Sequence, residues 1–523
     1  MPLVLEAKGA GDLEPGDLAV VRTGRGRARV ERMLGPAARI ENVLEALLVE
    51  RGARQPFEPH DPPDPDVEGR VDLRDLVTYT VDPETAEDFD DALSFRRETD
   101  GIRAWVHIAD VSFFVGAGTP LDHGAARRAF STYVPGAVAP MLPHELADDL
   151  CSLRPHQDRL CVTVELPPTG EPSFYRSVIR SDARLSYGEA ERREAPAPVL
   201  EALELNELVA QQLRRNRFAR GALQVQTPEV AFSFDGEGGV ADAWLEGEPY
   251  AHVLVEELMV RANEAVGSLL ASRRREALYR VHERPDPQAV LLLVSKLADL
   301  SVPTPPVPDP LSPQQAAALA GAISERVSEY ARQSGRGREA FPALVLRALK
   351  QARYEPRNLG HSGLASTAYC HFTSPIRRYP DLVVHRALLR ELGLADEPLP
   401  PDLPELGEHV SEREREAAQV EYLADEICLA WLLERRLFEL GWDHRWPGEI
   451  VGLIGSGLFV RFGEVFEGFL PARRLHGEFF ELNRLGTALV GRTTGRKYRL
   501  GDPVEVRVES IARSEGKVEL ARP

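Results

Sequence analysis

Cysteine is scarce in this chain of 523 residues, and its spacing argues against two kinds of structure. The four cysteines form no CxxC pair and no other zinc-binding spacing. So few thiols also do not suggest the disulfide framework of a small secreted domain. We therefore expect buried free thiols in a reducing cytoplasm at Cys151, Cys161, Cys370 and Cys428.

Long apolar runs and excess positive charge are also missing. No apolar segment reaches the roughly 20 residues of a membrane span, and none follows Met1 as in a secretory signal. The net charge of −19 argues superficially against a nucleic-acid partner. Phosphate binding depends, however, on where basic residues cluster. Such clusters occur at residues 127–128, 214–217, 273–275, 377–378 and 496–499.

Aspartate, in contrast, is dense between residues 82 and 91. Alternation over residues 77–82 predicts a strand that ends at Asp82, and Pro83 begins a turn that sends the chain back. Asp88, Asp90 and Asp91 are thereby brought near Asp82. Clustered carboxylates repel each other and an unpaired buried charge is costly, so the loop predicts a compensating cation.

The ligand types in this loop favour magnesium or manganese, because hard cations prefer oxygen and no Cys or His lies nearby. A solvated acidic turn is a competing interpretation, and it requires no ligand. A calcium loop of the EF-hand type fails, because counting from Asp82 puts Glu87 where the turn glycine belongs.

A second motif occupies residues 371–386, which run His-Phe-Thr-Ser-Pro-Ile-Arg-Arg-Tyr-Pro-Asp-Leu-Val-Val-His-Arg. Together with the aspartate loop, it resembles the ribonuclease II / ribonuclease R family of exoribonucleases, whose catalytic part is the RNB domain. The resemblance runs from about Asp72 to the C-terminus. Further blocks that agree in order are residues 107–112, 140–143, 150–153, 255–259, 279–283 and 360–361.

The resemblance implies a processive 3′→5′ exoribonuclease that hydrolyses single-stranded RNA to nucleoside 5′-monophosphates. It implies two Mg²⁺ ions as cofactor, with Mn²⁺ as a substitute, in a clamp around the reacting phosphate. Asp82, Asp88 and Asp91 resemble metal ligands. Asp90 resembles the residue whose loss stops hydrolysis, through the second ion or by orienting the water. Arg377 resembles the arginine that reaches the scissile phosphate.

Four other residues are implied to contact RNA less directly. Tyr133 matches a tyrosine that stacks on bases, Glu256 a carboxylate that accepts from ribose hydroxyls, and Glu421 a glutamate near the terminal nucleotides. Arg378 is assigned a structural or backbone-contact role. Without the resemblance, a buried aromatic and two helix-surface acids are the simpler interpretations of the first three.

The chain also departs from the family pattern. Val225 stands where ribonuclease II relatives place a clamping phenylalanine, which leaves the final product length open. Ser362 replaces an aromatic that is common in the ribonuclease R type. His107 is interpreted as structural, because family members vary there.

The expected fold class is an α+β catalytic domain followed by an all-β OB-fold of the S1 type. Residues 1–55 predict a small basic module, a hairpin plus a helix, either winged or helix–turn–helix-like or a barrel remnant. Residues 56–70 form a proline-rich linker, 71–445 the catalytic domain and 446–523 the S1-type barrel. Phe459, Phe462 and Phe469 are candidates for a base-stacking platform on that barrel, although some must fill its core.

The predicted partner is RNA with a free 3′ end, mainly single-stranded, with overhang-bearing duplexes as further substrates. We expect a monomer in the cytoplasm, without a membrane. A catalytically impaired RNA-binding regulator is the alternative, and loss of one aspartate ligand would have favoured it. A metal-dependent DNA exonuclease is disfavoured by the match at Glu256.

Overall fold

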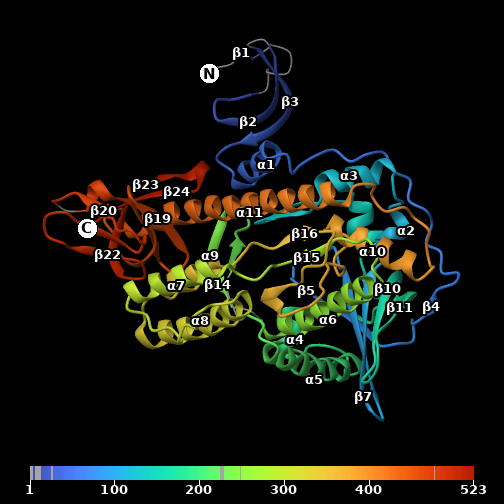
Figure 1. Ribbon diagram of the computed structural model, residues 1–523. Helices are drawn as coiled ribbons and strands as arrows, with labels where there is room; N and C mark the ends of the chain where they lie inside the picture. The colour runs from blue at the N-terminus through green and yellow to red at the C-terminus, as the bar shows by residue number, and fades with distance from the viewer. Residues whose placement is uncertain (1–3, 6–12, 25–26, 224–228, 248, 476) are drawn as a thin grey trace.

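A seven-stranded sheet lies at the end of the molecule away from the C-terminal barrel, here described from a computed structural model (Figure 1). The structure describes residues 4–5, 13–24, 27–223, 229–247, 249–475 and 477–523. The outermost pairs, β12 with β5 and β11 with β4, are parallel and the inner pairs are antiparallel. In sheet order the strands are β12 (Ala183–Ser186), β5 (Thr78–Asp82), β6 (Asp91–Glu98), β7 (Gly101–Ala109), β10 (Asp158–Leu166), β11 (Ser173–Arg180) and β4 (Val71–Asp72).

Strand β5 ends at Asp82 as predicted, but it is buried on both faces rather than on one. The side chains of Thr78 and Thr80 are as buried as those of Tyr79 and Val81. The Thr78 hydroxyl is satisfied by the carbonyl of Leu76 at 2.8 Å and lies 2.7 Å from the Ser94 hydroxyl. The alternation of residue types therefore does not mark a solvated face, since both threonines lie inside the sheet and the hydroxyl of Thr78 finds partners there.

Two long helices, α5 (Ala197–Ala219) and α6 (Tyr250–Ser272), pack against the sheet and each other. Helix α10 (Tyr379–Glu391) contains the second half of the motif at residues 371–386, and eleven of its residues are buried. The shorter elements of this part are α2 (Val111–Phe114), α3 (Pro120–Arg128), β8 (Thr132–Val134), β9 (Ala137–Ala139), α4 (Tyr187–Arg192), β13 (Glu229–Phe234), β14 (Val240–Glu246), β15 (Tyr279–Val281) and β16 (Arg353–Glu355).

The 38-residue helix α11 (Leu403–Leu440) runs from the sheet-containing part to the C-terminal barrel (Figure 1). The charged-then-apolar pattern of residues 412–440 predicts the later part of this helix but not its first turns, which include Pro404. The helix starts earlier because the Asp402 side chain accepts from the Glu405 backbone N–H at 2.9 Å, and proline is tolerated in the first turn.

Five strands close a barrel at the C-terminus, as expected for the fold class. In barrel order they are β17 (Trp446–Ile454), β18 (Gly457–Phe462), β19 (Phe466–Pro471), β24 (Lys517–Ala521) and β23 (Pro503–Ala512). The chain turns at residues 500–502, between β22 (Lys497–Arg499) and β23. Strand β22 pairs with β21 (Ala488–Gly491), beside β20 (Phe480–Leu482).

A helical subassembly lies beside the barrel, with Leu500 of the C-terminal part packed into its core (Figure 1). It consists of α7 (Pro287–Asp299), α8 (Pro313–Ser334) and α9 (Ala340–Ala348). Among the helices of the described ranges, none is long and apolar enough to cross a membrane. All four cysteines are buried and free, as predicted.

The N-terminal segment contains the predicted hairpin and helix: β2 (Asp17–Gly24), β3 (Arg27–Pro36) and α1 (Ile40–Glu50), with β1 (Val4–Leu5) added parallel to β3. Its turn residues, Arg25 and Gly26, lie outside the described residues. Part of its basic charge is neutralised, since Arg22 pairs with Glu31. Helix α1 packs into a core shared with α11. The nature of this module and the domain boundaries stay predictions.

Candidate active site

The aspartate loop and the arginine motif meet at Asp90. One carboxylate oxygen of Asp90, Oδ1, accepts from the Ile376 backbone N–H at 2.8 Å. Its Oδ2 accepts from Arg377 Nε at 3.2 Å, while Arg377 Nη2 donates to Ser374 Oγ at 3.1 Å. Asp90 is almost fully buried, whereas the Arg377 side chain is 44% exposed. The guanidinium is therefore anchored at one edge and open to solvent elsewhere.

Arg378 points into the protein and makes a different contact. It donates to both carboxylate oxygens of Asp381, at 3.0 and 2.7 Å, and Asp381 also accepts from the Ser374 backbone N–H. Asp381 is fully buried on the first turn of α10. These contacts support the structural role expected for Arg378, which fixes the backbone that presents Arg377.

Burial leaves the four loop carboxylates poorly compensated. Desolvation raises the pKa of Asp82, and the nearby Asp91 carboxylate raises it further. Desolvation also raises the pKa values of Asp88, Asp90 and Asp91, although Arg377 opposes the shift in each case. Asp82 Oδ2 is buried without a hydrogen-bond partner in the structure. The site thus concentrates more negative charge than its own side chains neutralise.

This arrangement fits a hard divalent cation. Within the described ranges, no group of three or more Asp, Glu, His or Cys side chains is already arranged to hold a metal ion. The unpartnered oxygen of Asp82 and the repulsion among Asp82, Asp88, Asp90 and Asp91 are nevertheless what a bound cation would relieve. Carboxylate oxygens without nearby sulfur or imidazole match magnesium or manganese.

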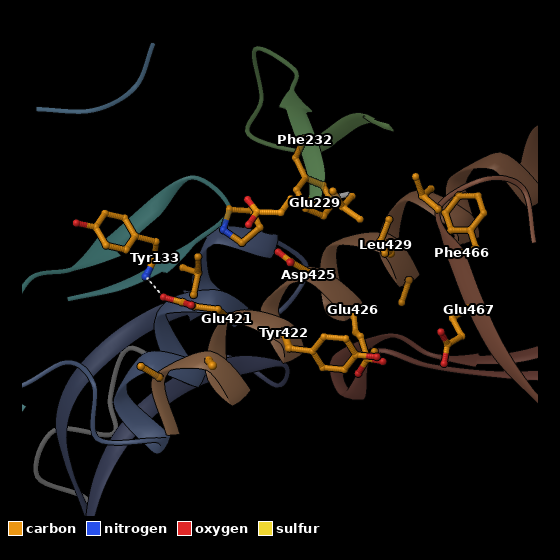
Figure 2. A pocket seen from close by; sticks show the side chains of 18 of the residues that line it. Tyr133, Glu229, Phe232, Glu421, Tyr422, Asp425, Glu426, Leu429, Phe466 and Glu467 are labelled. Atoms are coloured by element: carbon orange, nitrogen blue, oxygen red, sulfur yellow. Dashed lines mark hydrogen bonds between the residues drawn. The ribbon is translucent and has the colours of Figure 1, made fainter. Parts of the chain in front are cut away.

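Arg377 lines a cavity of about 830 Å³. The cavity extends along α11 to the barrel, where Phe466 and Glu467 line it (Figure 2). Its lining is strongly acidic, with Glu229, Glu421, Asp425, Glu426 and Glu467. Burial, reinforced by the nearby carboxylates of Glu421, Glu229 and Glu426, raises the pKa of Asp425 to about 7. Sequence reasoning missed Asp425, although its position four residues after Glu421 puts both on one face of a helix.

Tyr133 on β8 connects the aspartate loop to this cavity. Its hydroxyl donates to Asp88 Oδ2 at 2.6 Å, and its backbone N–H donates to Glu421 Oε1 at 2.8 Å (Figure 2). Two residues earlier, the Ser131 backbone N–H donates to the Arg377 carbonyl at 3.0 Å. The structure therefore brings together Asp88, Arg377, Tyr133 and Glu421 from four separate parts of the sequence.

Residues 70–393 match the family model described as the RNB domain, which covers more than half of the chain. The chain belongs to the RNB domain family. Ribonuclease R of Escherichia coli is 35% identical over 481 residues, which cover 87% of this chain and 57% of that relative. Ribonuclease R of Aquifex aeolicus is also 35% identical, over 88% of this chain and 66% of the relative. The chain thus spans less than two thirds of these curated relatives.

Solved structures share the fold of this chain. Mycoplasma genitalium RNase R in complex with ribose methylated single-stranded RNA matches with a TM-score of 0.88 and 25% identity, over 100% of this chain and 85% of that one. Yeast Ssd1, described as a pseudonuclease, matches with a TM-score of 0.68 and 17% identity, over 90% and 61% of the two chains. The family resemblance and the fold class inferred from the sequence are therefore confirmed.

Glu256 is placed differently from the other candidates of the RNB site. It lies on α6, outside the described lining of the acidic cavity, 3.4 Å from Arg217 Nη2. The same guanidinium forms a 2.5 Å ion pair with the buried Glu257. A ribose contact for Glu256 stays a prediction. Val225, the departure expected to affect the terminal bases, lies outside the described residues.

One of the three barrel aromatics is assigned wrongly by the sequence. Phe462 is only 2% exposed and packs against Trp446 and Phe466, so it fills the barrel core rather than binding RNA. Phe459 and Phe469 are partly exposed, with ring centroids 5.2 Å apart. Phe459 also lines a second cavity of about 470 Å³, between the barrel and α9.

His107 has the structural role expected from the sequence. It is fully buried on β7, with its ring nitrogens 3.0 Å from Ser94 Oγ and 2.9 Å from Thr163 Oγ1. Burial lowers its pKa to about 3, so the imidazole is neutral at physiological pH. These contacts place it inside the sheet, among neighbouring strands.

Proposed function

We propose that this protein is a magnesium-dependent 3′→5′ exoribonuclease that degrades single-stranded RNA to nucleoside 5′-monophosphates. The observation that carries this proposal is the contact of Asp90 with Arg377, which joins a buried carboxylate cluster to an open guanidinium. The relatives called ribonuclease R support it, as does the RNA-bound RNase R of similar structure. Because the chain spans only part of the curated relatives, activity and substrate are proposals for this chain.

The chain's own residues divide the work of hydrolysis. Asp82, Asp88, Asp90 and Asp91 would hold the divalent cations, and Asp90 also keeps Arg377 in place. When bound, the cations supply charge stabilisation and an activated water. Arg377 presents a planar, permanently charged fork toward solvent, which suits an oxygen of the reacting phosphate. Water attacks the phosphate that joins the 3′-terminal nucleotide to the rest of the RNA. The 3′ oxygen of the upstream nucleotide departs, and a nucleoside 5′-monophosphate is released.

The acidic cavity gives the RNA path an unusual character. Carboxylates such as Glu421 and Asp425 repel phosphates but accept hydrogen bonds from ribose hydroxyls and base amino groups. We infer that RNA crosses this region with sugars or bases, rather than phosphates, toward α11. Tyr133 is the aromatic surface available for stacking beside Asp88.

A catalytically impaired RNA-binding protein is the second candidate, and the shared fold of the pseudonuclease Ssd1 motivates it. The presence of all four aspartates and Arg377 favours the enzyme. A DNA exonuclease is the third candidate. It requires that substrate binding not depend on ribose 2′-hydroxyls. We also expect the protein to be a monomer and to be located in the cytoplasm.

One assay separates these candidates. A 5′-labelled RNA, the DNA of the same sequence and an RNA duplex with a 3′ overhang are each incubated with the full chain in Mg²⁺ or in EDTA. We expect progressive shortening of single-stranded RNA in Mg²⁺ and a mononucleotide product, with DNA intact. Binding of RNA without any shortening would instead support the impaired regulator. Equal degradation of DNA would support the third candidate.

A further inference from the structure

Tyr133 has two features that stacking on RNA does not require. Its hydroxyl is 2.6 Å from Asp88 Oδ2, a short and charge-assisted hydrogen bond, and its backbone N–H is fixed by Glu421. A residue that serves only as a platform for bases needs a ring face and no partner for its hydroxyl. The contact joins two separate parts of the chain, because Tyr133 and Asp88 are 45 residues apart in the sequence.

We propose that Tyr133 is a positioning residue for the cation site, because its hydroxyl holds Asp88 as an oriented carboxylate ligand. The inference rests on the proposed function, in that Asp88 must be a ligand. It adds a role for the Tyr133 hydroxyl that is separate from the role of its ring. The bond engages Asp88 Oδ2, and the other oxygen, Oδ1, would face the cation.

The charge balance of the loop supports this role. Asp88 is partly buried in a loop that also carries Asp82, Asp90 and Asp91, so repulsion and burial both act against its charge. The hydroxyl of Tyr133 opposes both effects by donating to the ionised carboxylate. Hydrogen-bond donors that orient metal ligands are known to contribute to metal affinity, and their loss typically costs about 10–100-fold.

Backbone hydrogen bonds around Tyr133 hold its hydroxyl in position to donate to Asp88. Strand β8 pairs with β9, and the Ser131 N–H is bonded to the carbonyl of Arg377. Glu421, on the rigid helix α11, receives the Tyr133 N–H. One three-residue segment, 131–133, therefore touches the phosphate-contacting arginine motif, the aspartate loop and the lining of the cavity. A displacement of the Tyr133 ring in the cavity would also move the donor to Asp88.

The test uses the Tyr133→Phe variant of the full chain, which removes the hydroxyl and keeps the ring. Mn²⁺ binding is measured without RNA, from the electron paramagnetic resonance signal of free Mn²⁺. Tyr422→Phe is the matched control, because Tyr422 lines the same cavity but its hydroxyl interacts with Glu426 instead of the aspartate loop. We expect Mn²⁺ affinity to fall by about 10–100-fold in Tyr133→Phe and to stay unchanged in Tyr422→Phe.

A second readout separates metal positioning from RNA binding. The affinity of Tyr133→Phe for single-stranded RNA in EDTA should stay within about two-fold of the wild type, because stacking uses the retained ring. The Mg²⁺ concentration needed for half-maximal hydrolysis should rise, and saturating Mg²⁺ should restore most of the rate. Unchanged Mn²⁺ affinity would overturn the inference, as would loss of RNA affinity in EDTA.

The outcome is distinguishable from failure of the proposed function. If wild type degrades RNA and Tyr133→Phe binds Mn²⁺ as tightly as wild type, only the role of the hydroxyl is wrong. If wild type neither degrades RNA nor binds Mn²⁺ through the loop, as judged by an unchanged affinity in Asp90→Asn, the proposed function fails and the inference fails with it.

Discussion

Asp90 and Arg377 are 287 residues apart in the chain and 3.2 Å apart in the structure. The same carboxylate also accepts from the Ile376 backbone N–H, so Asp90 fixes both the side chain and the backbone of the arginine motif. Neither sequence motif forms the site alone. The aspartate loop supplies the negative charge, and the motif at residues 374–378 closes over it through these two contacts.

Replacing Asp90 with asparagine should stop catalysis while preserving the fold. Asparagine keeps an oxygen that accepts from the Ile376 N–H, but it loses the charge that pairs with Arg377 and attracts a cation. We expect hydrolysis of single-stranded RNA to fall by more than about 100-fold, with RNA affinity within about two-fold of wild type. Single-turnover cleavage and fluorescence anisotropy measure the two quantities. Turnover within a few-fold of wild type would show that Asp90 has no catalytic role.

Replacing Arg377 with lysine should impair the reaction more than binding. Lysine keeps the positive charge but cannot contact Asp90 and Ser374 while presenting a planar fork to phosphate. We expect kcat to fall by about 10–100-fold with little change in RNA affinity. Arg461→Lys is the matched control, since Arg461 also lines the cavity but pairs with Glu339 and Glu467. Equal losses in both variants would contradict a specific role for Arg377.

Much of the site was predictable because its chemistry is concentrated in short motifs. The proximity of Asp82 to the other aspartates follows from a strand that ends in a turn, and the structure has that strand. The Tyr133–Asp88 hydrogen bond was not predictable, because no periodicity or spacing relates β8 to the aspartate loop. Asp425 was missed for a different reason. Its helix has the charged pattern of a solvent-exposed helix, and nothing in that pattern predicts that the barrel and the β13–β14 hairpin enclose the residue.

The barrel shows where local patterns fail. Phe459 and Phe462 lie three residues apart on β18, so simple alternation puts their side chains on opposite faces. The sequence does not say which face is the interior. That choice depends on closure of the barrel and on contacts such as those of Phe462 with Trp446. Helix α11 likewise begins before the predicted residue because a side-chain cap, not its apolar pattern, sets its start.

Arg378 should matter for stability. Its removal would leave Asp381, which is fully buried, without its only charged partner among the described contacts. Loss of one partner of a buried ion pair typically costs about 3–5 kcal/mol. We expect Arg378→Met to lower the free energy of unfolding by about that amount in urea titrations. Adding Asp381→Asn should recover part of the loss, whereas an additive loss in the double variant would argue against the pair.

The charge of Asp82 should make the metal-free protein less stable at higher pH. The folded state raises the pKa of this carboxyl above its unfolded value of about 4, through burial and Asp91. The protonated Asp82 carboxyl therefore contributes its full stabilisation of the folded state at a pH below its pKa in the unfolded chain. That contribution is lost as the pH rises through its pKa in the folded protein. In EDTA, Asp82→Asn should therefore have a higher apparent Tm than wild type at pH 8, with the difference shrinking toward pH 4.

Divalent cations provide the control for this pH dependence. Mg²⁺ should raise the Tm of the wild type at pH 8 and should affect Asp82→Asn less, because a ligand stabilises the folded state in proportion to its binding. Scanning calorimetry at several pH values in EDTA and in Mg²⁺ measures both effects. A wild-type Tm in EDTA that rises from pH 5 to pH 8 relative to the variant would mean that Asp82 is stabilised as a carboxylate by groups other than a cation.

Phe459 and Phe462 provide a matched pair for testing the barrel as an RNA platform. Phe459 is partly exposed beside Phe469 and lines a cavity with Arg338 and Arg461, so Phe459→Ala should weaken binding of long single-stranded RNA by about 1–3 kcal/mol. The fold should be unaffected.

Phe462→Ala should instead cost about 3–5 kcal/mol of folding stability, because it leaves a void between Trp446 and Phe466. Affinity for oligonucleotides of four or five residues should not change in Phe459→Ala, since they are short enough to stay near Arg377. If Phe459→Ala binds long RNA as well as wild type does, the exposed aromatic pair is not part of the RNA path.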